Sequence, residues 1–321
     1  MAKKIWLLFI IILFSFSSFY GQSKNIHFSF EPQISLSYEK HGEYLLYENE
    51  EPISYLDWRG FPLIRTGIEA GFSINSFTTE VELFSGIPIS CGTMYDSDWN
   101  SNGVKIIYSE NNINLLSDFN SAIKLLYDFK FGRFEILPSL QLQYEAKSFK
   151  AHDGHGWYGL SEYSKSGVDV SWDDDNATYY SHIGGYSSYV IQNFLTFIGC
   201  QGKFAVSPSF SLGLGTYISP YSYTYTKDTH YKKSGKISKY VYAEQSSIFY
   251  RFKGEVFINV KMFNGLYFNT NISTVLGGKS FGDYRFYRIN PFNEEYYLAD
   301  TGKSASDLIS GTIKVGIRKI F

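Results

Sequence analysis

Two short acidic motifs lie far apart in the chain, Asp96-Ser97-Asp98 and Asp228-Thr229-His230, and an aromatic residue follows each directly. In both motifs the titratable residues are spaced i, i+2. On extended backbone this spacing puts both side chains on one face of the chain. If the fold brings the motifs together, three carboxylates and an imidazole share one cleft. Such a group can hold a water molecule and accept its proton.

The segments that must position these motifs have the pattern of β-strands. Tyr and Phe occur 28 times each and Pro only 8 times, a usage that favours strands. Apolar and polar residues alternate along about ten runs, which predicts an all-β, antiparallel fold. The runs are 26–38, 56–72, 77–89, 112–130, 133–150, 186–200, 204–226, 240–263, 265–285 and 306–321.

The connections between these runs alternate in length. Short turns are expected at 73–76, 132, 201–203 and 264–265, and long polar segments at 41–54, 92–111, 151–185, 227–239 and 286–305. Short turns on one side and long loops on the other are typical of an outer-membrane barrel. The sequence therefore predicts a ten-stranded transmembrane β-barrel with long extracellular loops, whose wall continues above the membrane as a cup. The second and fourth loops carry the two motifs, so both are expected at the extracellular mouth.

A soluble sandwich or barrel also shows alternation and is the alternative fold. Such a fold would not need strands longer than the roughly 9–11 residues that cross a bilayer at a tilt.

The N-terminal residues have the features of a secretory signal peptide. Lys3 and Lys4 precede an apolar run, residues 5–13, that is too short to span a bilayer comfortably. We expect residues 1–21 to be removed and 22–321 to form a single barrel domain. The net charge of −2 gives no basis for nucleic-acid binding. Cys91 and Cys200 are too few for a disulfide framework, and we expect unpaired thiols in the barrel wall.

Three segments resemble the omptin family, the ten-stranded outer-membrane endoproteases of Gram-negative bacteria. They are Leu56-Asp57-Trp58, Met94 to Trp99, and Lys227 to Tyr231, and the similarity in order and length extends over nearly the entire mature chain. The resemblance implies peptide hydrolysis by an activated water, without a metal and without a covalent intermediate. His230, oriented by Asp228, would be the general base. Asp96 and Asp98 would hold the water from the other side, and one of them, with a raised pKa, would share a proton with the developing oxyanion.

The resemblance also implies binding residues. The family places an acidic residue two positions before the Asp of the Asp-x-His motif, where this chain has Thr226, and a second pocket acid in the first loop, here matched by Glu43. With one carboxylate missing, the preference for basic substrate residues is expected to weaken. Family members require lipopolysaccharide on the outer wall, and Tyr144, Glu145 and Lys147 match its contact pattern imperfectly. These three residues otherwise read as a polar rim above the apolar belt.

Other functions stay open at this point. A non-catalytic adhesin could use the same long loops for binding, and a lipid-modifying barrel enzyme is a more distant alternative. The segments 152–157 and 172–176 lack the ligand spacing of zinc or calcium sites, so no metal is expected. The expected partners are peptide or protein substrates at the cell surface and outer-membrane lipid.

Overall fold

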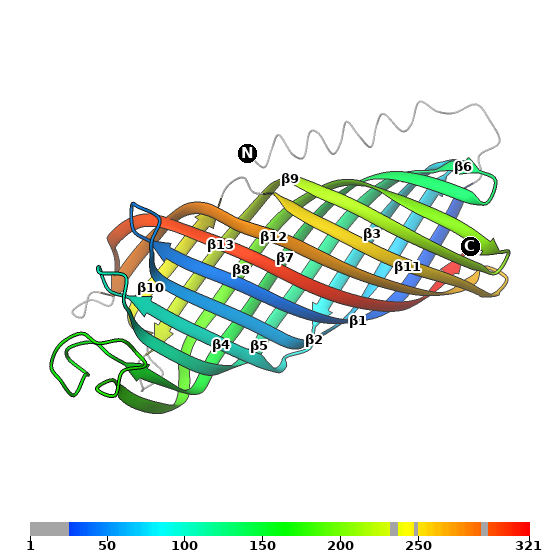
Figure 1. Cartoon of the computed structure of the whole chain (residues 1–321). Helices are drawn as coiled ribbons and strands as arrows, with labels where there is room; N and C mark the ends of the chain where they lie inside the picture. Colours follow the sequence, from blue (N-terminus) through cyan, green and yellow to red (C-terminus); the bar gives the residue numbers. More distant parts are fainter. Residues whose placement is uncertain (1–25, 232–236, 247–249, 290–294) are drawn as a thin grey trace.

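The computed structural model describes residues 26–231, 237–246, 250–289 and 295–321. The expected signal peptide lies outside these residues. The described chain forms one antiparallel sheet of thirteen strands (Figure 1). Within it, no helix is long and apolar enough to cross a membrane. The strands are β1 (Ile26–Leu46), β2 (Pro52–Ile74), β3 (Phe77–Gly86), β4 (Ile89–Trp99), β5 (Lys105–Tyr127), β6 (Phe129–Phe131), β7 (Phe134–Tyr158), β8 (Thr178–Ser207), β9 (Phe210–Tyr231), β10 (Ile237–Ser246), β11 (Arg251–Phe263), β12 (Leu266–Ile289) and β13 (Tyr296–Ile320).

The sheet closes on itself, because β1 pairs with β2 on one side and with β13 on the other. β3 and β4 both pair with β2 and β5, so these two segments share one position in the ring. β10 and β11 share a position between β9 and β12 in the same way. The expected count of ten strands is wrong, because the described chain forms thirteen separate strands. Pro88, which cannot donate a ladder hydrogen bond, separates β3 from β4.

Several expected boundaries are also wrong. The turn expected at 201–203 lies inside β8, and the chain turns at 208–209 instead. The segments expected as loops at 41–54 and 92–111 shrink to 47–51 and 100–104, because the strands continue past the apolar part of the wall. Figure 1 shows the short turns and the C-terminus at one end of the barrel and the longer connections at the other. We call the second end the mouth.

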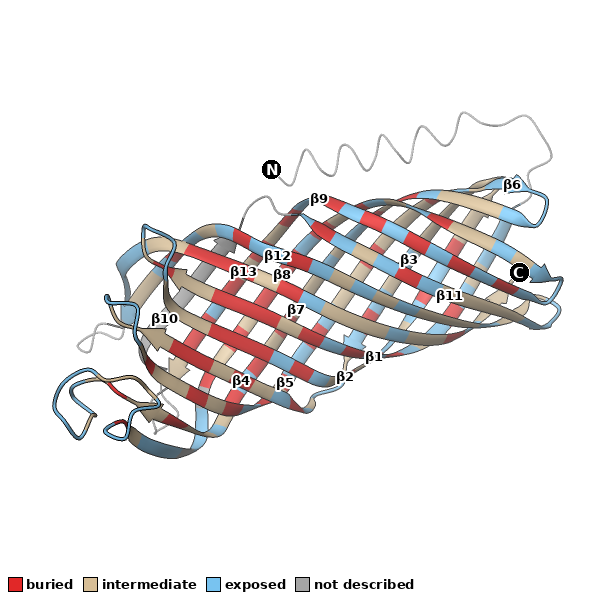
Figure 2. Ribbon diagram, viewed as in Figure 1, coloured by how far each residue is buried: buried red, intermediate tan, exposed pale blue. Residues whose placement is uncertain are grey.

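The wall is apolar on the outside over much of its length. Buried and exposed residues alternate along the strands (Figure 2), and the exposed ones include large apolar side chains on every side of the ring. A closed sheet with an exposed apolar belt is typical of barrels that sit in a membrane. The belt includes Ile34, Ile68, Leu83, Phe119, Leu142, Ile198, Leu214, Ile272 and Ile313. Cys91, inside the barrel, and Cys200, on its outer face, are free thiols, as expected.

The interior carries charges that are paired across strands. The buried guanidinium of Arg65 lies 2.7 Å from Glu39 Oε1 and 2.5 Å from Asp118 Oδ2, and it donates to Ser37 Oγ at 2.8 Å. Arg318 pairs with Glu31 at 2.6 Å and with Glu69. Towards the short turns the interior opens into a cavity of about 710 Å³, whose lining includes Glu31, Glu80, Lys124 and Arg318.

Replacing Arg65 is expected to destabilise the barrel strongly. Arg65→Ala leaves Glu39 and Asp118 buried without their counter-charge, which costs about 3–5 kcal/mol in the free energy of unfolding. The matched control is Lys130→Ala, because the Lys130 side chain is 67% exposed beside Asp128 and such pairs contribute about 0–1 kcal/mol. Urea unfolding in lipid vesicles, followed by gel mobility of the folded barrel, measures both. Equal losses in the two variants would contradict this account of the interior.

Candidate functional site

The first aspartate pair lies on a strand and not in a loop, contrary to expectation. Asp96 and Asp98 are near the end of β4, and Asp96 is only 6% exposed. In the ladder, Asp98 lies opposite Ser54 on β2. Burial raises the pKa of Asp98, and a hydrogen bond with Ser54 and the charge of His230 only partly offset that increase. Asp98 therefore binds a proton more readily than an ordinary aspartate does.

The Asp-His pair also lies on a strand, at the mouth end of β9. His230 Nε2 is 2.6 Å from Asp228 Oδ2. Asp228 is buried, whereas the His230 side chain is 22% exposed. The carboxylate therefore orients the imidazole through Nε2.

The two pairs act on each other electrostatically across the barrel. Burial alone would lower the pKa of His230, but the charge and hydrogen bond of Asp228 raise it, and the charges of Asp96 and Asp98 raise it further, to about 9. Such interactions weaken with distance and with solvent screening. The fold thus brings the four residues of the two motifs to one mouth, although β4 and β9 are not neighbours in the sheet.

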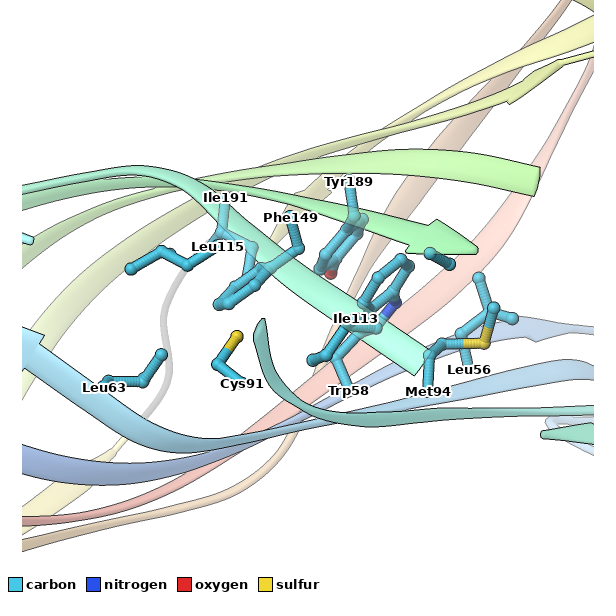
Figure 3. Packing of buried hydrophobic residues seen from close by; sticks show 11 residues of the cluster. Leu56, Trp58, Leu63, Cys91, Met94, Ile113, Leu115, Phe149, Tyr189 and Ile191 are labelled. Atoms are coloured by element: carbon cyan, nitrogen blue, oxygen red, sulfur yellow. The ribbon is translucent and has the colours of Figure 1, made fainter. Parts of the chain in front are cut away.

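An apolar cluster of eleven buried residues packs inside the barrel (Figure 3), and two of its members, Leu56 and Tyr189, lie opposite Asp96 and Asp228 in the ladder. The ring of Tyr189 stacks on Trp58 at 4.8 Å. The Tyr189 hydroxyl is 3.0 Å from His41 Nδ1. Burial, with the charges of Arg251 and Lys147, lowers the pKa of His41 to about 3, so this histidine is neutral. The floor of the mouth is therefore rigid and uncharged. The cluster comprises Leu56, Trp58, Leu63, Cys91, Met94, Ile113, Leu115, Phe149, Ala151, Tyr189 and Ile191.

The two residues matched to the substrate pocket both face the interior. Glu43 on β1 is 3% exposed and lies opposite Leu56, which in turn lies opposite Asp96. Thr226 is fully buried, two residues before Asp228 on the same face of β9. Below it, the buried Arg251 donates from Nη2 to Thr224 Oγ1 at 3.0 Å. A fixed cation near Thr226 further disfavours a positively charged substrate side chain there.

The expected lipid contacts at Glu145 and Lys147 are wrong. Both side chains point into the barrel, where Lys147 Nζ lies 3.1 Å from Glu145 Oε2 and 3.1 Å from Glu39 Oε2. Successive strand residues face opposite sides, so only Tyr144, between its inward neighbours on β7, is exposed on the outer wall. A lipid contact of Tyr144 stays a prediction.

The sequence reasoning missed a tyrosine group near the aspartates and a serine motif on β12. The three tyrosines that pack together at the mouth are Tyr158, Tyr163 and Tyr180. They come from two strands and a long loop, so no local sequence pattern predicts the group. The motif Gly278-Lys279-Ser280-Phe281-Gly282 has the Gly-x-Ser-x-Gly spacing of a hydrolase elbow. Ser280 is buried within a continuous strand, whereas an elbow requires a turn from strand to helix. Among the described residues, no group of three or more His, Cys, Asp or Glu side chains could hold a metal.

Comparison with solved structures finds a fold match over nearly the full chain. The outer membrane protease OmpT from Escherichia coli superposes with a TM-score of 0.77 at 16% identity, covering 94% of this chain and 99% of that one. The translocator domain of autotransporter NalP from Neisseria meningitidis has a TM-score of 0.34 at 8% identity (99% and 96% covered). OprG from Pseudomonas aeruginosa has a TM-score of 0.32 at 10% identity (92% and 95% covered). No family model and no curated protein sequence matches the chain. The chain therefore shares the fold of an outer-membrane protease barrel.

Proposed function

We propose that this protein is an outer-membrane endopeptidase whose active site is the mouth of the barrel. The observation that supports this most directly is the His230–Asp228 pair, bonded at 2.6 Å and under the charge of Asp96 and Asp98. A base with an orienting carboxylate, facing a second acidic pair, has the groups that water-mediated amide hydrolysis needs. The fold shared with OmpT is consistent with this chemistry.

In the proposed reaction a water molecule lies between the two pairs. Its oxygen forms a bond to the carbonyl carbon of the substrate, and its proton passes to the imidazole of His230. Asp228, held at Nε2, orients the ring and stabilises the imidazolium. His230 then gives the proton to the amide nitrogen, the C–N bond breaks, and an acid and an amine leave.

The aspartate pair has a separate role in the proposal. Asp96, in its ionised form, accepts a hydrogen bond from the water and orients it. Asp98, whose pKa burial raises, donates its proton as a hydrogen bond to the carbonyl oxygen while negative charge develops there. Donors already in place for that charge lower the barrier without reorganisation.

The exposed apolar belt supports placement in the outer membrane with the mouth facing outward. The short turns would lie on the periplasmic side, as in other barrels of this type. A requirement for lipopolysaccharide stays a prediction from the family resemblance alone. Adding it to lipid-reconstituted protein during the assays tests that requirement directly.

The proposal is tested by digesting a peptide library with the purified chain in lipid vesicles. Cleavage at internal bonds, detected by mass spectrometry, is the expected result. In water labelled with ¹⁸O, one labelled oxygen should enter each new carboxyl group. Binding of peptides or host surfaces without any cleavage would contradict the proposal and favour an adhesin.

The pH dependence of cleavage follows from the pKa of His230. The base must be unprotonated, and with its pKa raised to about 9 most molecules are inactive at neutral pH. We expect a bell-shaped dependence of kcat/KM on pH, because His230 must have lost its proton while Asp98 must still hold one. Asp228→Asn removes the main charge that raises the pKa, so the rising limb of its residual activity should lie at lower pH. Asp153→Asn is the control, because Asp153 pairs with a different histidine, His152, at 2.9 Å. A flat profile from pH 6 to 9 would argue against His230 as the base.

A further inference from the structure

Three tyrosine rings form a compact group at the mouth. The ring centroid of Tyr158 on β7 lies 5.8 Å from that of Tyr163 and 5.5 Å from that of Tyr180. The centroids of Tyr163 and Tyr180 are 5.9 Å apart, and all three pairs are in edge-to-face contact. Tyr163 and Tyr180 remain 41% and 45% exposed. Part of the apolar surface of this group is therefore open to solvent.

The ladder places the group beside the aspartates, on the same side of the sheet. Asp96 lies opposite Ser109 on β5, Ser109 opposite Gly156 on β7, and Gly156 opposite Tyr180 on β8. Directly opposed residues of antiparallel strands face the same side, so Tyr180 faces the interior as Asp96 does. Between the acid and the ring lie only a serine and a glycine.

A second row of the ladder runs from Asp98 in the same direction. Asp98 lies opposite Ile107, and Ile107 lies opposite Tyr158. Burial raises the pKa of Tyr158 to about 12, with the charges of Asp96 and Asp98 contributing, so its hydroxyl stays protonated close to both acids. An apolar side chain and an aromatic ring thus flank the aspartate pair at its own level.

The loop that carries Tyr163 is held by its own hydrogen bonds. Tyr163 N donates to Leu160 O at 2.8 Å, Lys165 N donates to Asn176 O at 2.8 Å, and Thr178 Oγ1 donates to Tyr163 O. The third ring is therefore in position before a ligand arrives. A preformed surface binds with a smaller entropy cost than one that must be ordered.

We propose that Ile107, Tyr158, Tyr163 and Tyr180 form a subsite for a large apolar side chain of the substrate, above all an aromatic one, next to the scissile bond. This inference rests on the proposed function and specifies its substrate class. Another aromatic ring extends the edge-to-face packing that the tyrosines already make, and it covers the exposed ring surface. Asp96 and Tyr180 are three strand spacings apart, about 14 Å, and only the small residues Ser109 and Gly156 lie between them, so the main chain of the substrate can lie over this row next to the acids.

The glycine in this row cannot be replaced without disturbing it. A Cβ on Gly156 would lie 2.7 Å from Ser109 Cβ and 2.8 Å from Tyr108 O. Both distances are well inside van der Waals contact. The surface between the acid and the tyrosines is thus built from the smallest residue, in direct contact with the neighbouring strand.

Cleavage of a matched peptide series tests the subsite. Library digestion locates the cut, and peptides with Phe, Ala or Arg beside it are then compared. We expect kcat/KM for Phe to exceed that for Ala by about tenfold or more. Tyr163→Ala and Tyr180→Ala should each remove most of this ratio. Tyr179→Ala is the matched control, because Tyr179 is the neighbouring tyrosine on β8 and packs on the other side, against Trp157.

Binding to the His230→Ala protein separates this inference from the proposed function. Fluorescence anisotropy of labelled Phe, Ala and Arg peptides reports the subsite whether or not cleavage occurs. If nothing is cleaved but the Phe peptide binds best and Tyr163→Ala weakens it, the protease proposal fails and the subsite stands. Cleavage with a preference for Arg, or a Phe preference that neither tyrosine variant changes, would overturn the subsite and leave the protease. Absence of any Phe preference in both assays overturns the subsite as well.

Discussion

Replacing His230 or Asp228 with alanine should reduce peptide cleavage by a factor between about 10² and 10⁴. His230→Ala removes the proposed general base, an imidazole held by a carboxylate oxygen at 2.6 Å. Asp228→Ala leaves the imidazole without its orienting carboxylate. Because the two residues act as one unit, the double variant should lose little more activity than either single variant. Initial rates on one cleavable peptide, at pH 9 and in lipid vesicles, measure all three.

The matched control for these variants is His155→Ala. His155 packs against Trp157 and Tyr179, and its Nε2 lies 4.0 Å from Glu110 Oε2. It is therefore a histidine near a carboxylate in another part of the same end of the barrel. Its replacement should leave the rate within about twofold, as expected for a surface substitution away from the reacting atoms. Full activity in folded His230→Ala protein would remove the catalytic assignment.

The second large effect is expected at the aspartate pair. Asp96→Asn keeps the shape but removes the charge that orients the water, and Asp98→Asn replaces the acidic carboxyl proton that faces the oxyanion with the much less acidic protons of an amide. Each should lower kcat by about 10² to 10³, the usual cost of removing one such interaction. Because both charges raise the pKa of His230, each variant should also move the rising limb of the pH profile to lower pH. A shift in the pH of this rising limb distinguishes a local electrostatic effect from partial unfolding. Partial unfolding would lower the rate without moving the limb.

Glu110→Gln serves as the control for the aspartates. Glu110 is a carboxylate on β5 near the mouth, where it accepts a hydrogen bond from Tyr108 at 2.7 Å. Its loss should change neither kcat nor the pH limb. If Asp96→Asn or Asp98→Asn behaves as this control does, the pair has no part in the reaction.

Strand alternation in the sequence was enough to predict the all-β fold, whereas Asp96 and Asp228 were expected in loops and lie on strands. The same alternation also specifies which β7 side chains point into the barrel. Because Leu142 and Tyr144 face outward, counting by two places Glu145 and Lys147 inside, away from lipid. The family pattern alone does not specify this direction, which is why the lipid contact predicted for Glu145 and Lys147 is wrong.

The ends of the strands could not be read in the same way. From Tyr95 to Trp99 both faces of β4 carry polar or aromatic residues, since this part lies above the apolar belt. Alternation disappears there, while the hydrogen-bond ladder continues. Gly199 and Gly202 have the composition of a turn, yet they lie within the long strand β8. The tyrosine group could not be predicted from the sequence for another reason. Tyr163 joins Tyr158 and Tyr180 only through the path of a loop, which no local spacing specifies.

The apolar cluster beneath the mouth has a consequence for the membrane that holds the protein. Along β2 the buried side chains change in character from the mouth towards the short turns. Apolar residues come first and charged residues follow: Leu56, Trp58, Leu63, then Arg65 and Glu69. Packed apolar side chains and then ion pairs therefore occupy this part of the barrel interior. The cavity of about 710 Å³ at the far end therefore stays separated from the mouth. Under the proposed function, water for the reaction would enter through the mouth, and the barrel would do its chemistry there without opening a leak in the membrane around it.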